Sequence, residues 1–116
     1  MKIQFSRILL VWLMLIGLGA WAQEPRSGDD IVARNCMGCH VTGAARAPRP
    51  DHLADWQRVF ERNDYEKVVQ RAYDGFGRMP AKGFCTDCDR ADIERAIRAM
   101  MPQSLREQHP EMGSGS

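Results

Sequence analysis

Two cysteines three positions apart, Cys36 and Cys39, are followed directly by His40 in the stretch CMGCH. Two thiols at this spacing can bind a metal, form a redox pair, or be joined by thioether bonds to the edge of a porphyrin. In the porphyrin case the adjacent histidine is carried beneath the iron as an axial ligand, which is the c-type haem arrangement. Each of these uses requires a fold that keeps this turn open to a bound group or a second thiol.

The first 22 residues have the pattern of a secretory signal. Lys2 and Arg7 precede an apolar run of 15 residues, Ile8 to Ala22, which ends in Ala-Trp-Ala. A membrane-spanning helix needs about 20 apolar residues, so this run is short for an anchor. We expect cleavage after Ala22, a periplasmic product and no stable membrane insertion after cleavage.

Cleavage changes the size and charge that matter for function. It leaves 94 residues, and because Lys2 and Arg7 are lost, 14 basic residues face 15 acidic ones and the net charge falls from +1 to −1. A near-neutral chain without a basic stripe is a poor nucleic-acid binder. A domain this small is marginal without a disulfide, a metal or a cofactor.

The rest of the chain predicts an all-α domain, and no segment has a convincing strand pattern. Apolar residues recur at helical spacing in four segments, for which Ser27, Asp51, Asp64 and Asp89 are the expected N-caps. The expected helices run from about residue 28 toward 36, within 51–63, from 64 to 75 and from 89 to 102. Glycine and proline predict loops at 41–50 and 75–84, and the polar stretch 103–116 predicts a flexible tail.

Haem attachment is favoured over two alternatives for CMGCH. Cys36 and Cys39 could join Cys85 and Cys88 in a four-cysteine zinc site, but His40 would then have no role. A thioredoxin-like redox pair would be expected near a βαβ pattern, which the sequence lacks. Haem accounts for the histidine and suits an exported, helical chain.

Met79 is the favoured second axial ligand. It lies in a loop, GFGRMPAKGF, where glycines permit close approach and Pro80 restricts the conformations of Met79. Met100 and Met101 have the spacing of core residues. His52 is expected to be solvated or to cap a helix, and His109 lies in the predicted tail.

These motifs together resemble those of the class I c-type cytochromes, and most closely the short bacterial cytochrome c5 group. The resemblance rests on CMGCH, GAARAP, Trp56, GFGRMPAKG, CTDC and the last amphipathic segment, and it covers nearly all of residues 27–101. It implies a small helical domain, residues 23–102, wrapped around one covalently attached haem c.

The resemblance also implies a role for individual residues. Cys36 and Cys39 would hold the haem, and His40 and Met79 would be the iron ligands. Pro48 matches a proline whose carbonyl accepts a hydrogen bond from the histidine ring, and Trp56 matches a tryptophan beside a haem propionate. Cys85 and Cys88 would form a small disulfide. Phe84 departs from the pattern, since the group usually has a small residue there.

Two protein ligands leave no open iron position, so we expect electron transfer rather than catalysis. The expected protein is a soluble periplasmic carrier that shuttles single electrons between membrane-bound redox complexes such as an oxidase or a reductase. The alternatives are a haem c enzyme or small-ligand-binding protein with a displaceable Met79, and the zinc protein described above.

Overall fold

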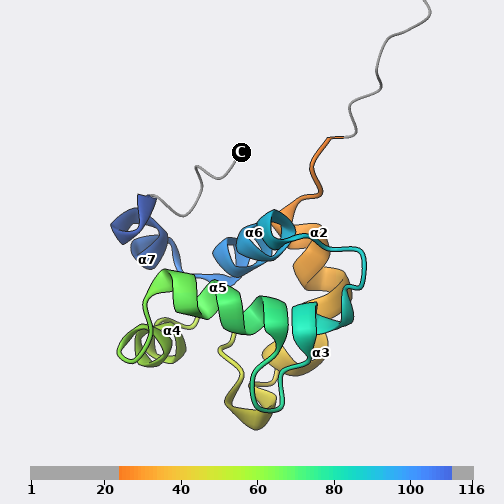
Figure 1. The fold of residues 1–116 in the computed structure, drawn as a ribbon. Coiled ribbons are helices and arrows are strands. Elements are labelled where there is room, and N and C mark those ends of the chain that lie inside the picture. Colours follow the sequence, from red (N-terminus) through yellow and green to blue (C-terminus); the bar gives the residue numbers. More distant parts are fainter. Residues whose placement is uncertain (1–23, 111–116) are drawn as a thin grey trace, which may run out of the picture.

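The structure is a computed structural model that describes residues 24–110, and this part of the chain is built from helices without a named strand (Figure 1). The predicted signal peptide, residues 1–22, lies outside the described residues, as does the end of the predicted tail. The elements, in chain order, are α2 Gly28–Ile31, the π-helical turn η1 Val32–Cys36, α3 Met37–His40, the 3₁₀ turn η2 Ala44–Arg46, α4 Leu53–Phe60, α5 Tyr65–Asp74, the 3₁₀ turn η3 Ala81–Phe84, α6 Arg90–Met100 and α7 Gln103–Gln108. The prediction of an all-α domain is confirmed.

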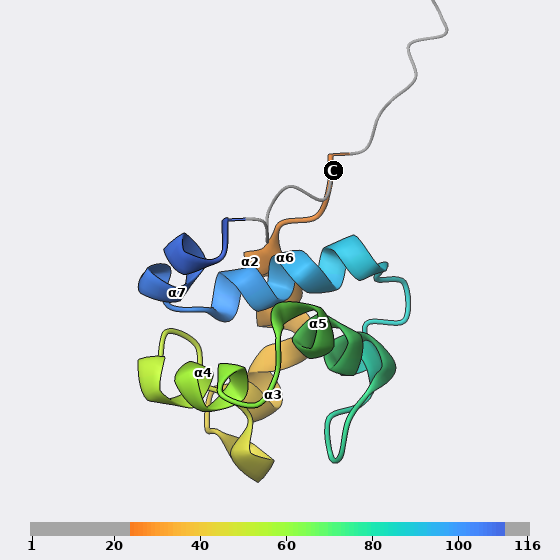
Figure 2. The ribbon, with the colours of Figure 1, turned by 60° about the vertical axis from the view of Figure 1, so that its left-hand side comes forward.

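The first described helix, α2, packs against the longest one, α6. Helix α2 lies against α6 in both views (Figures 1 and 2). Gly28 makes this crossing possible, because a Cβ at its position would lie 2.1 Å from the Arg95 carbonyl oxygen and 3.1 Å from the Ala99 Cβ. The two backbones are therefore closer than any larger residue would allow.

Three of the four predicted N-caps are confirmed. Ser27 accepts a hydrogen bond from the Asp30 N–H at 3.1 Å, and Asp64 accepts one from the Lys67 N–H at 2.8 Å. Asp89 forms a reciprocal capping box with the residue at the third helical position of α6. Each of these oxygens satisfies an N–H that the first turn of a helix leaves unpaired.

The prediction that Asp51 caps the second helix is wrong. Helix α4 begins one residue later, with His52 at the N-cap and no side-chain capping bond. Asp51 instead has φ +56°, and its N–H donates to the Met100 carbonyl at 2.9 Å. A residue turned into the left-handed region to reach α6 cannot also occupy the extended conformation of a cap.

The prediction of a flexible tail from residue 103 is wrong for its first part. Residues Gln103–Gln108 form α7, in which Leu105 is buried, and His109 stacks on Phe60 with ring centroids 5.2 Å apart. The sequence of α7 has one apolar residue in six, which gives no helical periodicity. The buried Leu105 and the stacking of His109 on Phe60 nevertheless hold this segment against the rest of the fold. Figure 2 shows α7 above α4, beside the end of α6.

The core is formed mainly by α6, α5 and the junction between α2 and η1. Its largest fully buried side chains, among the described residues, are those of Trp56, Val69 and Met101. Met100 is also buried, so both methionines of the MM pair pack in the core as predicted. Within residues 24–110, no helix combines the length and the apolar character needed to cross a lipid bilayer.

Candidate haem-binding site

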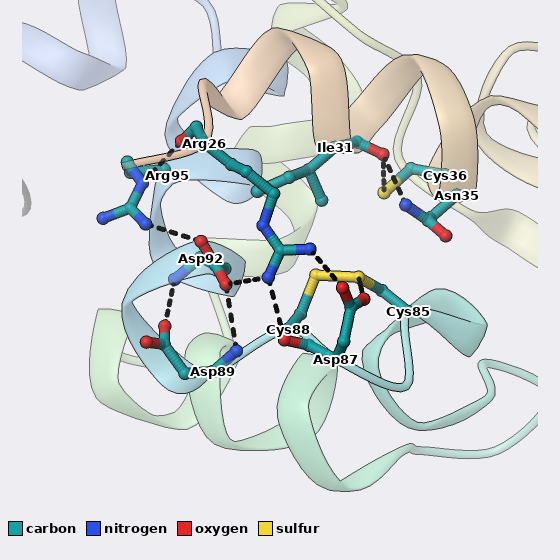
Figure 3. Close-up of a disulfide and its surroundings, with 10 residues drawn as sticks. All are labelled: Arg26, Ile31, Asn35, Cys36, Cys85, Asp87, Cys88, Asp89, Asp92 and Arg95. Carbon is teal, nitrogen blue, oxygen red and sulfur yellow. Dashed lines mark hydrogen bonds and ion pairs between the residues drawn. A yellow bond between two sulfur atoms is a disulfide. The ribbon is translucent and has the colours of Figure 1, made fainter. Parts of the chain in front are cut away.

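The CMGCH motif begins at the last residue of a π-helical turn, η1. Helix α2 passes through η1, and the wider turn places both the Cys36 Sγ and the Asn35 side-chain amide near the Ile31 carbonyl, at 3.9 Å and 3.2 Å. Helix α3 then carries Cys39 and His40. Turns of this type occur often at functional sites because the extra residue rotates the side chains that follow. Figure 3 shows Cys36 and Asn35 directed toward the Ile31 carbonyl.

The two thiols of this motif are not joined to each other. Cys39 is exposed and Cys36 is partly buried, and burial raises the pKa of the Cys36 thiol. Two unpaired thiols one helical turn apart are what covalent attachment of a porphyrin edge requires. The same two thiols do not form the disulfide of a thioredoxin-like oxidised pair.

His40 is buried, and its orientation is fixed by one hydrogen bond. Its Nδ1 lies 2.8 Å from the Pro48 carbonyl oxygen. A carbonyl oxygen only accepts, so Nδ1 carries the proton and donates it. This assigns the tautomer in which Nε2 has a free lone pair, which is the form of histidine that binds a metal. The bond expected between His40 and Pro48 is thus present.

The loop that carries Met79 is a tight hairpin. Phe76 and Met79 exchange both backbone hydrogen bonds, N–H to O at 2.9 and 3.1 Å, and Gly75 ends α5 with φ +90°. A Cβ on Gly75 would lie 3.0 Å from the Ala81 nitrogen, so this turn needs glycine. The Met79 side chain is partly buried against the core. The hairpin and η2 project from the same end of the molecule (Figures 1 and 2).

The other candidate ligands are already engaged elsewhere. His52 Nδ1 lies 3.3 Å from Asp55 Oδ1, and His109 stacks on Phe60. Trp56 is 1% exposed, and its indole N–H donates to the Arg49 carbonyl at 3.0 Å. The one donor of the Trp56 ring is therefore used within the protein, so a contact with a propionate would be made by the ring itself.

Cys85 and Cys88 form a disulfide, which confirms that prediction. The bond rules out the four-cysteine zinc site, because disulfide sulfurs are not thiolate ligands. Arg26 holds the bridged loop: its guanidinium donates to the Asp87 carboxylate at 2.9 Å, to the Asp87 carbonyl at 2.8 Å and to the Asp92 carboxylate at 2.8 Å (Figure 3). This clamp has no sequence signature, because Arg26 and Asp92 are 66 positions apart.

Asp92 makes stability depend on pH in a predictable direction. Burial alone would raise the pKa of Asp92, but hydrogen bonds from the Asp89 N–H and the guanidinium groups of Arg95 and Arg26 lower it. Ionised Asp92 therefore stabilises the fold above the unfolded-state pKa of about 4, and this contribution is lost as the pH falls further. We expect Asp92→Asn to lower the Tm at pH 7, and the difference from the unmodified protein to narrow below about pH 4.

The matched control for Asp92→Asn is Asp87→Asn, because both carboxylates bind Arg26. The Asp87 side chain is 78% exposed and that of Asp92 is 7% exposed. Exposed ion pairs contribute little, so the Asp87 variant should unfold close to the unmodified protein at every pH. An equal loss of Tm in both variants, measured by circular dichroism across the pH range, would contradict this account.

The residues of this site fit a covalently attached haem. The candidate donors are the imidazole of His40, with its fixed tautomer, and the partly buried thioether of Met79, and such a pair could bind haem iron. Large apolar side chains that remain exposed flank both donors: Val41, next to His40, is 54% exposed, and Phe76, paired with Met79, is 58% exposed. A haem would bring an apolar face to such side chains.

Comparison with known proteins supports the same assignment. The family model described as cytochrome C oxidase, cbb3-type, subunit III matches residues 23–98. Cytochrome c5 of Ectopseudomonas mendocina is 36% identical over 76 residues, 65% of this chain and 87% of that protein. Cytochrome c5 of Azotobacter vinelandii is 37% identical over 76 residues, with 65% and 92% covered. Cytochrome c-551 of Halorhodospira halochloris is 33% identical over 66 residues, with 57% and 78% covered. The chain therefore belongs to this cytochrome c family and is a class I c-type cytochrome similar to cytochrome c5.

Proposed function

We propose that the chain is a periplasmic electron carrier with one haem attached through Cys36 and Cys39 and an iron held by His40 and Met79. The observation that carries the proposal is the geometry of His40: its Nδ1–H donates to Pro48 at 2.8 Å, which leaves Nε2 free as a ligand directly after the two unpaired cysteines. Family membership implies the haem, and the ligand set and the single attachment are our own assignment.

The protein residues would act by holding one geometry in both redox states. When bound, haem supplies a one-electron Fe(II)/Fe(III) couple. The Pro48 carbonyl fixes the plane of the His40 ring and raises its basicity. The two backbone hydrogen bonds between Phe76 and Met79 restrict the backbone that carries the Met79 thioether. Small changes of geometry between the two states would favour fast electron exchange, and with both His40 and Met79 as ligands the haem iron would have no open position for a substrate.

Visible spectroscopy tests the ligand set. The protein, produced in a host that attaches haem c, should show a sharp α-band when reduced and a weak far-red sulfur-to-iron band when oxidised. Met79→Ala should remove the far-red band, because the sulfur is lost. Met101→Leu is the matched control, since it replaces a buried methionine with a residue of similar volume and should keep the band.

The outcomes separate the alternatives. A low-spin haem without the far-red band in the unmodified protein would move the sixth ligand away from Met79. Rapid binding of carbon monoxide to the reduced protein would favour a haem enzyme or a ligand-binding protein in which Met79 is displaced. A colourless product would contradict haem attachment altogether.

The proposed partners are membrane-bound redox complexes, such as an oxidase or a reductase, on the periplasmic side of the membrane. The support is the pattern of a secretory signal in residues 1–22 together with the likeness to cytochrome c5. Cell fractionation should recover the haem protein in the periplasmic fraction, with an N-terminus at Gln23. Recovery of residues 1–22 on the haem protein in the membrane fraction would contradict this location.

A further inference from the structure

One peptide unit lies between His40 and a buried carboxylate. Its carbonyl, from Pro48, accepts the His40 Nδ1–H at 2.8 Å, and its N–H, from Arg49, donates to Asp55 Oδ2 at 3.2 Å. The two bonds use opposite ends of the same planar group. His40 and Asp55 are thus connected through a single peptide plane.

Asp55 is held tightly in its position. It lies in the first turn of α4, and its side chain is 7% exposed. The Arg49 Nε donates to the same Oδ2 at 2.7 Å, and Arg58 and His52 contact Oδ1. The Arg49 guanidinium holds the pKa of the Asp55 carboxyl well below its usual range, so Asp55 is ionised in the folded protein.

The neighbouring contact fixes the same stretch from the other side. The Arg49 carbonyl accepts the Trp56 indole N–H at 3.0 Å, and Trp56 follows Asp55 in α4. Two consecutive residues of one helix therefore bind the N–H and the C=O of Arg49. The orientation of the preceding carbonyl, that of Pro48, follows from this, because a peptide unit does not twist about its C–N bond.

A peptide whose N–H donates to an anion becomes a better acceptor at its carbonyl. Hydrogen bonds in a chain polarise one another, and the low dielectric of a protein interior strengthens this effect. A stronger acceptor for Nδ1–H shifts electron density onto the imidazole and raises its basicity toward a metal. A more basic ligand stabilises Fe(III) relative to Fe(II) and therefore lowers the reduction potential.

We propose that Asp55 is a positioning residue for His40, which orients and polarises the Pro48–Arg49 peptide and so sets the donor strength of the axial imidazole. The inference rests on the proposed function, in which His40 binds iron.

The test is proton NMR of the reduced, diamagnetic holoprotein labelled with ¹⁵N. In Asp55→Asn and Asp55→Ala the His40 Nδ1 proton should move upfield and exchange with solvent roughly fivefold faster, as expected for a weakened hydrogen bond. The reduction potential should rise in both variants. Asp55→Asn keeps the shape of the side chain, so it preserves the test if Asp55→Ala does not fold.

Two variants separate this role from simple charge. Asp51→Asn removes the same charge from an exposed site, and asparagine tolerates the φ of +56° found there. Arg58→Gln removes a cation that binds Oδ1 while leaving both contacts of Oδ2 with Arg49. Neither should change the Nδ1 proton, and Arg58→Gln should lower the potential, the opposite of the Asp55 variants.

The outcomes distinguish this inference from the proposed function. If the unmodified protein shows no iron-bound His40, the proposed function fails and no Asp55 effect is defined. If His40 binds iron and its Nδ1 proton is unchanged in both Asp55 variants, the positioning role is overturned. An Nδ1 change of equal size in Asp51→Asn would also overturn it, because charge alone would then explain the effect.

Discussion

Replacing Gly28 with alanine should lower the free energy of unfolding by about 3 kcal/mol, the upper part of the range for an overpacked contact. The added Cβ would lie 2.1 Å from the Arg95 carbonyl oxygen and 2.7 Å from its carbon. Both neighbours are backbone atoms of α6, so no side chain can rotate away. Helices α2 and α6 would have to separate, and the Arg95 Nε bond to the Arg26 carbonyl, 2.9 Å long, would weaken with them.

Gly38→Ala is the matched control for this variant. Gly38 lies in α3, and a Cβ there would meet no described protein atom within 4 Å. Alanine usually stabilises an exposed helical site by about 0.5–1 kcal/mol relative to glycine. Denaturant unfolding of the two holoproteins, with haem content checked by absorbance, measures the difference. Equal stabilities would show that the α2–α6 crossing has more room than the structure indicates.

The haem-free chain should show no cooperative unfolding transition. Cys36→Ala/Cys39→Ala removes both thiols and with them the proposed covalent attachment. The described residues bury few large side chains, of which Trp56, Val69 and Met101 are the most completely enclosed, and leave Val41 and Phe76 more than half exposed. So small a core does not offset the chain entropy of a domain of this size. Thermal scans by circular dichroism should give a broad, featureless loss of helix.

The second cysteine pair supplies the control for that experiment. Cys85→Ser/Cys88→Ser also removes two sulfurs, but it leaves the haem attached. Opening so short a loop should cost about 2 kcal/mol, and a cooperative transition should survive at a lower Tm. A sharp transition in the haem-free variant would contradict the view that haem completes the core. Loss of cooperativity in both variants would assign that role to the disulfide as well.

Local features of the fold were predictable from the sequence. Asp64 and Asp89 were recognised as caps because a carboxylate before an apolar stripe satisfies N–H groups within the next three residues. Gly75 was recognised as a helix end for a similar reason, since few other residues adopt its φ of +90°. In the site, Cys36, Cys39, His40 and Met79 were named because their residue types and spacing carry the chemistry without reference to tertiary contacts.

The features that were missed depend on contacts across the fold or on unusual backbone. The η1 turn has no sequence signature, because a π-helical turn is fixed by how the helices around it pack. In the sequence Asp55 is one of several polar residues in the α4 segment. Its burial and its hydrogen bonds from the Arg49 N–H and Nε depend on the fold of the preceding loop. Phe84, with φ +65° and 79% of its surface exposed, adopts a conformation that glycine favours, and nothing else in the described structure explains it.

The contact between α2 and α6 also sets the order in which the molecule can be assembled. Gly28 and Arg95 are far apart in the sequence but in contact in the fold, so α2 lacks its main partner until α6 has been synthesised. Such long-range closure is slow compared with the formation of local turns. Until then, Cys36 and Cys39 belong to an open chain, accessible to any machinery that modifies them. The same crossing that limits residue size at Gly28 would thus give the proposed haem attachment time to precede closure of the fold.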